Sequence, residues 1–142
     1  MATEVPDHPL EEHEVPGIAR FWFAMRRFEH GTEVITRECG LTPQRYILLL
    51  AVFSGSADGG TATVSGIRRD LQMPQSTVSE AVARAVDVGL LKKAAVVDDA
   101  RVTRITLTPE GRARLAQCVR RLQRVRADLR QALIDTFAAY PD

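Results

Sequence analysis

The sequence has little of what enzymes and membrane proteins require. Only three histidines occur among its 142 residues, and two of them, His8 and His13, fall near the N-terminus. No nucleophile motif is present and no two carboxylates share a predicted helix face, so the residues do not assemble a reaction centre. The longest apolar run, from Tyr46 to Phe53, is far too short to span a membrane. We therefore expect neither an enzyme nor a bound cofactor.

Cysteines and targeting signals are equally scarce. The two cysteines, Cys39 and Cys118, are too few for a disulfide framework and do not have the spacing of metal ligands. The N-terminus is acidic and lacks the apolar core of a signal peptide. A cytoplasmic location is therefore expected.

The charge of the chain is distributed unevenly between the N-terminal segment and the remainder. The net charge is +1, but the first 14 residues hold five acidic side chains and no lysine or arginine. The remainder has 19 basic against 13 acidic residues, a net charge of +6, which suits a nucleic-acid partner. We interpret residues 1–15 as a flexible acidic arm. His8 and His13 would be too mobile there to form a preorganised metal site, so no metal is expected.

The most informative pattern runs from residue 63 to residue 111. Ile67 and Leu71 predict the apolar face of a short helix with Ser65 as its N-cap. The turn at residues 72–74 ends this helix, because the residue before a proline avoids helical backbone angles. A second helix is predicted from Pro74 to about Val88, where a glycine follows. The order is that of a helix-turn-helix.

The second helix has a clear inner and outer side. At 100° per residue the inner side collects four apolar positions: Val78, Val82, Ala85 and Val86. The outer side is polar and begins with small hydroxyl side chains, which can approach phosphates and base edges closely. It carries Ser76, Thr77, Glu80, Ala83 and Arg84, with Ser79 at the border. An ordinary amphipathic surface helix would show the same pattern.

A predicted hairpin follows and favours DNA binding over a plain surface helix. Residues 90–97 form the first strand, residues 98–100 the turn and residues 101–107 the return strand. Arg101 and Arg104 would point outward, which suits a narrow minor groove. Residues 61–63 would add a short third strand. Helix, turn, helix and basic ribbon together predict a winged helix-turn-helix.

At this point the sequence resembles the MarR family of bacterial transcriptional regulators in three motifs. The first opens the helix before the winged unit and reads Leu41-Thr42-Pro43-Gln44. The second, on the second helix, reads Thr77-Val78-Ser79-Glu80 and is followed at family spacing by Gly89-Leu90. The third is the wing signature, carried here by Asp99, Arg101, Leu107, Thr108 and Gly111. The motifs occur in the family's order across residues 41–111.

The resemblance implies a homodimer that binds a pseudo-palindromic operator in double-stranded DNA. The fold class would be mainly α with a small β-wing, with a winged unit at residues 41–111 between dimerisation helices at residues 16–40 and 112–142. Helix residues would contact bases and phosphates, and Arg101, oriented by Asp99, would enter the minor groove. The DNA-binding candidates are Arg68, Arg69, Gln75, Ser76, Thr77, Ser79, Glu80, Arg84, Asp99, Arg101 and Arg104.

Two features depart from the family pattern. Glu80 stands where the family commonly has a basic residue, and a carboxylate there would repel phosphates but accept a hydrogen bond from cytosine N4. The loop at residues 54–61 is several residues longer than usual. The first departure puts the operator sequence in doubt more than DNA binding itself.

The flanking segments predict helices with more apolar surface than one protomer can cover. The segment from Gly17 to Glu38 is rich in aromatic residues at its start, and a seam of apolar residues recurs every three or four positions from Leu115 to Ala132. Both stripes would pack against a partner chain. Seven arginines between Arg112 and Arg130 would form a second nucleic-acid surface or a solvated face that pairs partly with acids of the partner, and we favour the solvated face.

Most members of the family are repressors released by small aromatic or anionic ligands, and the resemblance implies the same here. Aromatic or cationic candidates near the expected site are Trp22, Arg26, His30, Arg45 and Tyr46. Core packing or surface exposure explains each of them at least as well.

Two alternatives stay open. A winged-helix module for a protein partner is favoured by Glu80 and the low net charge. A redox-sensing regulator would need Cys39 to be exposed at the end of its helix, but we favour a structural or incidental role for this residue. Cys118 would be buried and inert.

Overall fold

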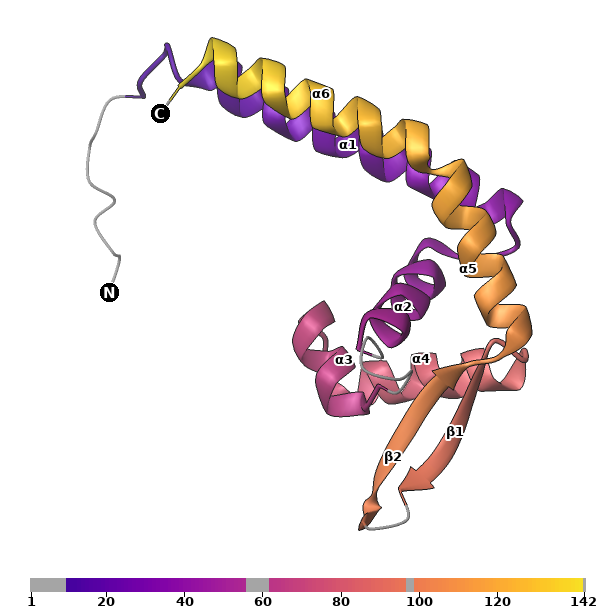
Figure 1. Cartoon of the computed structure of the whole chain (residues 1–142). Helices are drawn as coiled ribbons and strands as arrows, with labels where there is room; N and C mark the ends of the chain where they lie inside the picture. Colours follow the sequence, from indigo (N-terminus) through magenta and orange to yellow (C-terminus); the bar gives the residue numbers. More distant parts are fainter. Residues whose placement is uncertain (1–9, 56–61, 97–98, 142) are drawn as a thin grey trace, which may run out of the picture. The chain divides into compact units, whose positions relative to one another are not determined.

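The computed structural model describes residues 10–55, 62–96 and 99–141, and of residues 95, 96 and 99–102 it describes the backbone alone. Within these ranges the chain forms six α-helices and one antiparallel hairpin (Figure 1). This confirms the predicted fold class, mainly α with a small β-wing. The elements are α1 (Val15–Glu38), α2 (Pro43–Ser54), α3 (Val64–Leu71), α4 (Gln75–Asp87), β1 (Leu91–Val96), β2 (Asp99–Leu107), α5 (Pro109–Arg121) and α6 (Gln123–Ala139).

The chain divides into two compact units. The first unit combines residues 1–31 with residues 124–142, and the second comprises residues 32–123. α1 therefore begins in one unit and ends in the other. The functional division of the chain at residues 40 and 111 stays a prediction.

The second unit has a closed apolar core built from helices and the hairpin. Leu49 and Val52 of α2 are fully buried, as are Val82 of α4 and Ile105 of β2. The sequence explains the start of α2, because the Thr42 hydroxyl accepts a hydrogen bond from the Arg45 N–H at 3.1 Å and Pro43 follows the cap. The motif at residues 41–44 thus opens this helix, as predicted.

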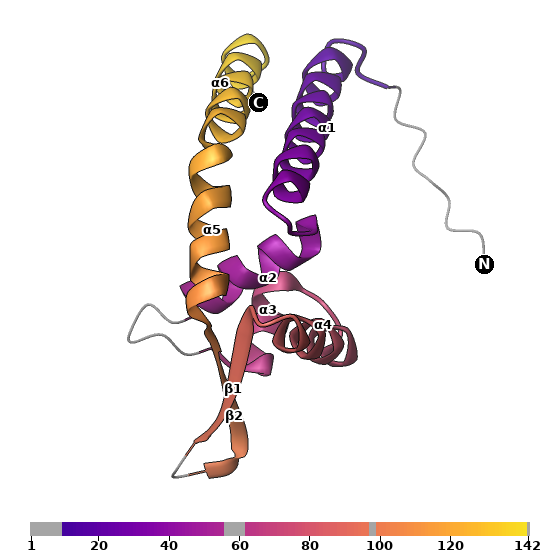
Figure 2. The same cartoon turned by 90° about the vertical axis from the view of Figure 1, so that its right-hand side faces the viewer.

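The hairpin projects from the helices of the second unit, as Figure 2 shows in profile. Its strands pair in register from Leu91↔Leu107 to Ala95↔Thr103, and an irregularity follows before Val96↔Asp99. The predicted third strand is reduced to one bridge, in which Ala62 exchanges hydrogen bonds of 2.9 and 2.7 Å with Ile105. Residue 61 lies outside the described range.

Local boundaries differ from the sequence prediction at four places. The cap of α3 is Thr63 instead of Ser65, because the extended backbone of Thr63 lets its hydroxyl accept the Gly66 N–H at 3.2 Å. Asp99, which was predicted to lie in the turn, belongs to β2. α1 begins at Val15, so the last residue of the predicted arm is helical. The long C-terminal pattern is split at the buried residue Leu122 into α5 and α6.

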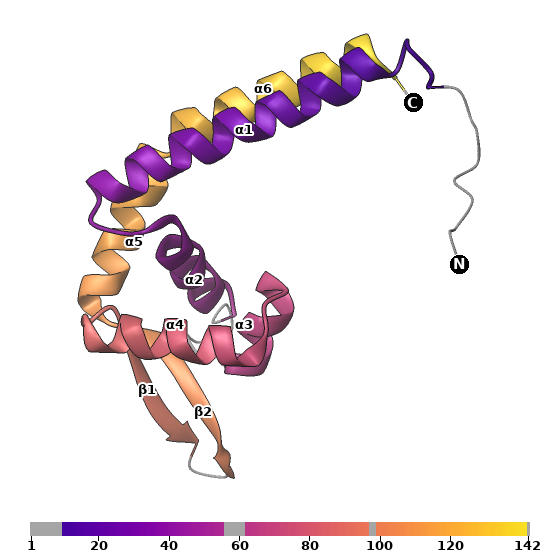
Figure 3. The ribbon, with the colours of Figure 1, turned by 180° about the vertical axis from the view of Figure 1, so that it is seen from behind.

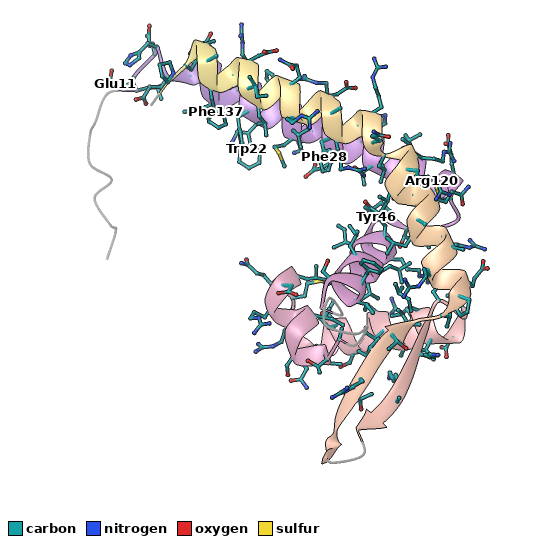
Figure 4. All side chains as sticks on the ribbon, in the orientation of Figure 1. Glu11, Trp22, Phe28, Tyr46, Arg120 and Phe137 are labelled. Carbon is teal, nitrogen blue, oxygen red and sulfur yellow. The ribbon has the colours of Figure 1, made fainter. Side chains whose placement is uncertain are left out.

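The first unit is an antiparallel helix pair with an open apolar surface. The Arg20 guanidinium lies 5.3 Å from the centre of the Tyr140 ring, and at the other end of the pair Val125 approaches Gly31. Apolar side chains stay exposed on both helices, and Trp22 and Phe137 project from the same side of the pair in Figure 4. Exposed fractions reach 60% for Trp22 and Phe23 and 54% for Phe137.

None of the helices in the described ranges combines the length and the apolar content that a membrane crossing requires.

Candidate nucleic-acid interface

A tight turn joins α3 to α4 and leaves one side of α4 on the outside of the second unit (Figure 3). α3 ends at Leu71 and is followed by the C-cap residue Gln72, whose backbone is left-handed at φ 52° and ψ 42°. The Met73 N–H donates to the Arg68 carbonyl at 3.3 Å. Pro74 then takes the N-cap position of α4. The backbone at residues 72–74 therefore turns the chain sharply between the two helices.

The two sides of α4 are as different as its periodicity predicts. Val78, Val82 and Ala85 are at most 1% exposed and fix the helix on the core of the unit. The outer side presents the polar candidates Gln75, Ser76, Ser79, Glu80 and Arg84, all exposed, with Thr77 half-buried. The exposed face therefore offers hydroxyl, amide and charged groups, with no large apolar side chain among these candidates.

The charge of α4 itself is not basic. Its ionisable residues are Glu80, Arg84 and Asp87, a net charge of −1. An Arg84 Nη2 atom lies 3.6 Å from a Glu80 carboxylate oxygen, and both side chains are about 70% exposed. α4 alone would therefore not attract a phosphate backbone.

Basic side chains flank α4 on both neighbouring elements. Arg68 and Arg69 of α3 are exposed, and Arg69 lies 3.8 Å from Asp70. On the hairpin, Lys92, Lys93 and Arg104 are exposed. The strand register puts Lys92 and Arg104 on the same face of the ribbon, because Lys92 pairs with Thr106 and Ala94 pairs with Arg104.

The two hairpin lysines are absent from the sequence-based candidates. The signal was available, because a Lys-Lys pair begins one residue after a buried strand position. Arg101 and Asp99, the predicted minor-groove pair, lie on β2, and their side chains fall outside the description.

One cluster of hydrogen bonds ties the end of α4, the base of the hairpin and the start of α5 together. The Thr108 hydroxyl donates to the Gly89 carbonyl at 2.5 Å and accepts the Gly111 N–H at 3.0 Å. The Thr108 N–H also donates to the Leu90 carbonyl at 3.1 Å. Gly89 is left-handed at φ 77°, and a Cβ at Gly111 would lie 2.1 Å from the Leu90 oxygen. The Leu-Thr and glycine of the wing motif therefore hold the hairpin to the helix beside it.

The structure corrects the prediction for Cys39. This side chain is buried, at 5% exposure, and its thiol is hydrogen-bonded to the fully buried thiol of Cys118. An Arg121 nitrogen lies 3.9 Å from the Cys39 sulfur, and Arg121 also pairs with Glu38. Burial, with the Cys39 thiol as a second cause, raises the pKa of Cys118 to about 12. Because the end of α1 is folded against α5, Cys39 is not exposed as the redox alternative requires, and the predicted burial of Cys118 is confirmed.

The predicted effector residues are divided between the units. Trp22, Arg26 and His30 are exposed on α1 in the first unit. Arg45 and the buried Tyr46 lie at the start of α2 in the second. Two cavities of about 700 and 540 Å³ open within the first unit, and neither is lined by any of these five residues. Their role as an effector site stays a prediction.

Several arginines of α5 and α6 pair with acidic residues of this chain. Arg114 lies 2.8 Å from Glu110, and Arg124 lies 3.4 Å from Asp128. Arg112 covers the ring of Phe53 with its guanidinium 5.5 Å from the ring centre. These contacts favour the solvated-face interpretation of the arginines, with intrachain acids as partners in these two pairs.

Comparison with known proteins points to one family. Residues 40–102 match a model of the MarR family. No curated protein matches the chain. The fold is similar to that of AbsC, a MarR family transcriptional regulator from Streptomyces coelicolor, with a TM-score of 0.73, 20% identity, and coverage of 90% of this chain and 83% of that one.

Two further solved structures have the same fold. A variant of Escherichia coli MarR in complex with operator DNA is similar at a TM-score of 0.70 and 16% identity, with 92% of each chain covered. Bordetella bronchiseptica BpsR, whose structure concerns regulation of its DNA binding by 6-hydroxynicotinic acid, is similar at a TM-score of 0.58 and 22% identity. The likeness to BpsR covers 83% of this chain and 96% of that one.

Proposed function

We propose that the chain, whose residues 40–102 match a model of the MarR family, acts as a homodimeric, sequence-specific DNA-binding regulator of transcription. The observation that carries the proposal is the arrangement of charge on the second unit. A polar, exposed α4 face lies between exposed cations of α3 and of the hairpin. This arrangement suits base contacts by α4 and phosphate contacts by its neighbours.

The roles of the side chains follow from their places. Ser76, Thr77, Ser79 and Glu80 lie toward the N-terminal half of α4, the part of a recognition helix that meets base edges. Arg68 and Arg69 of α3, with Lys92, Lys93 and Arg104 of the hairpin, would contact phosphates. Arg101, oriented by Asp99, would reach the minor groove.

Dimerisation is supported by the uncovered apolar surface of the first unit. Ile18, Trp22 and Phe23 on α1 and Ile134 and Phe137 on α6 are each at least 54% exposed. A second copy that covers this surface would bring two α4 helices to one operator. Half-sites would then lie about 34 Å apart, one turn of DNA, and the operator would be a pseudo-palindrome.

Release by a small aromatic or anionic ligand completes the proposal, with repression as the expected mode. BpsR has a similar fold, and its DNA binding is regulated by 6-hydroxynicotinic acid, a small aromatic acid. A ligand releases DNA only if it binds the DNA-free arrangement more tightly than the DNA-bound one. We expect aromatic carboxylates added to a preformed complex to lower its fluorescence anisotropy, and an unchanged anisotropy across such a set would remove this part of the proposal.

The experiment that tests DNA binding begins with a genomic pull-down on the purified protein. An enriched duplex is then titrated by fluorescence anisotropy at several salt concentrations. We expect tight binding and an affinity that falls steeply with salt, because phosphate contacts release counterions. Weak binding that is indifferent to sequence would instead favour a winged-helix module for a protein partner.

A paired substitution tests the role of the hairpin. Replacing Lys92 and Lys93 together by alanine should weaken binding to all duplexes alike and lower the salt slope by about 2, since each phosphate contact contributes about 1. The double variant Arg27→Ala/Arg130→Ala is the matched control, because it also removes two exposed cations, here from the first unit. An equal loss in both variants would mean that only total charge matters.

A further inference from the structure

The outer ridge of α4 carries a carboxylate at its centre. With Val78, Val82 and Ala85 buried, a helix of 3.6 residues per turn points Ser76, Glu80 and Asp87 most directly away from the core. All three are exposed. Glu80 follows Ser76 by one turn and belongs to the half of α4 that meets base edges.

This position is unsuitable for phosphate and suitable for a base. Exposed cations stand on α3 and on the hairpin, where phosphates would be bound, so a carboxylate on the outer ridge of α4 would be directed to the floor of the groove. There the cytosine N4 amino group is the donor that glutamate accepts, whereas guanine and thymine offer acceptors at the corresponding position. Adenine has a donor at N6, but its N7 acceptor lies beside that donor and repels a carboxylate.

The contact with Arg84 reduces the repulsion that this carboxylate would experience next to DNA phosphates. The Arg84 guanidinium lies one turn further along α4, 3.6 Å from the Glu80 carboxylate. It reduces the local negative charge and limits the orientations of the Glu80 side chain. The pair is exposed, so it adds little to the stability of the fold. Its effect is expected on recognition.

We propose that Glu80 selects a C·G base pair in each half-site by accepting a hydrogen bond from cytosine N4, with Arg84 as the residue that positions its carboxylate. The inference rests on the proposed function, because it requires that α4 enters a major groove. By the symmetry of a dimer, the selected pair would occur once in each half of the operator.

The test uses the full-length protein and its enriched operator, with every base pair of one half-site replaced in turn by the other three. For the unaltered protein, we expect one position at which C is preferred about 5- to 150-fold over other bases. Glu80→Ala should abolish the preference at that position and leave the others unchanged. Glu80→Gln should move the preference to A at the same position, because glutamine pairs with adenine N6 and N7.

Asp87→Asn is the matched control. Asp87 is an exposed carboxylate on the same ridge, about two turns further along α4, and its replacement removes the same charge. It should change affinity for all duplexes alike and leave every base preference intact. Arg84→Ala should weaken the C preference at the Glu80 position.

The outcomes separate the inference from the proposed function. If Glu80→Gln strengthens binding to every duplex equally and shifts no preference, Glu80 acts only by repelling phosphate and the inference is overturned. If the unaltered protein binds no duplex with sequence preference, the proposed function fails first. A shift from C to A confined to one position would establish Glu80 as the specificity residue.

Discussion

The two units of this chain treat their apolar residues in opposite ways. The second unit buries them: Leu49, Val52, Val82 and Ile105 are fully covered by other parts of the same unit. The first unit exposes them, with Trp22 at 60% on α1 and Phe137 at 54% on α6. Exposed apolar patches of this kind mark interaction surfaces. The contrast indicates that the second unit is self-contained, whereas the first unit has an apolar surface that suits a partner.

Gly111→Ala should break the self-contained unit and have the largest effect. The added Cβ would lie 2.1 Å from the Leu90 carbonyl oxygen, so the backbone at the base of the hairpin must move. We expect a loss of about 3 kcal/mol in the free energy of unfolding, measured by urea denaturation.

Gly66→Ala provides the control for this substitution. A Cβ at Gly66 would meet the Thr63 Oγ1 at an ordinary 3.4 Å, and the residue is inside α3. This change should leave stability equal or raise it by about 0.5–1 kcal/mol. Similar losses in the two variants would contradict the assigned contact between Gly111 and Leu90.

Trp22→Ala should act on the open unit instead. Because the side chain is exposed, its loss should leave the folded protomer intact but remove a large aromatic anchor from the dimer. We expect the dissociation constant of the dimer to rise by about 30-fold or more, equivalent to about 2 kcal/mol, as measured by sedimentation equilibrium.

Arg26→Ala is the comparison for Trp22, because Arg26 lies one turn along α1 and forms an exposed ion pair with Glu29 at 4.0 Å. The dissociation constant of the dimer should hardly change in the Arg26→Ala variant. A dimer unaffected by both changes would mean that the exposed apolar surface has another occupant.

The buried thiols of Cys39 and Cys118 should make the stability of the second unit depend on pH. The pKa of Cys118 is raised from 9.0 to about 12, so the folded state favours the protonated thiol. The contribution of this protonated thiol to the free energy of unfolding is complete below pH 9 and is lost as pH rises from 9 toward 12. Between pH 9 and 10 it should cost about 1 kcal/mol of the free energy of unfolding. Cys118→Ala should lack this increment in pH-dependent urea denaturation, and an identical slope in both proteins would disprove it.

The sequence was most informative where local chemistry determines structure. Thr42 with Pro43 and Thr108 with Pro109 mark the starts of α2 and α5, because caps depend on neighbouring residues. The inner side of α4 was also predicted, because its apolar period is regular. The predicted motif residues Thr108 and Gly111 were identified through the family resemblance, and the structure adds their physical task at the hairpin base.

The failures arose where distant segments meet. The burial of Cys39 depends on Cys118 and Arg121, which lie far along the chain, and no local pattern indicates that contact. One error was local: Thr63 caps α3 instead of Ser65, two residues later, because the choice between nearby hydroxyls depends on backbone angles. The effector candidates, which are aromatic or cationic side chains near the expected site, are distributed over both units, and their role stays a prediction.

The most direct test of the account inserts base pairs between the two halves of the enriched operator and measures affinity by anisotropy. A homodimer with two α4 helices at a fixed separation should lose most of its affinity when five base pairs are inserted, because one half-site then faces the opposite side of the duplex. Equal affinity for the original and the lengthened operators would contradict binding as a homodimer, since each winged unit would then bind independently of its partner.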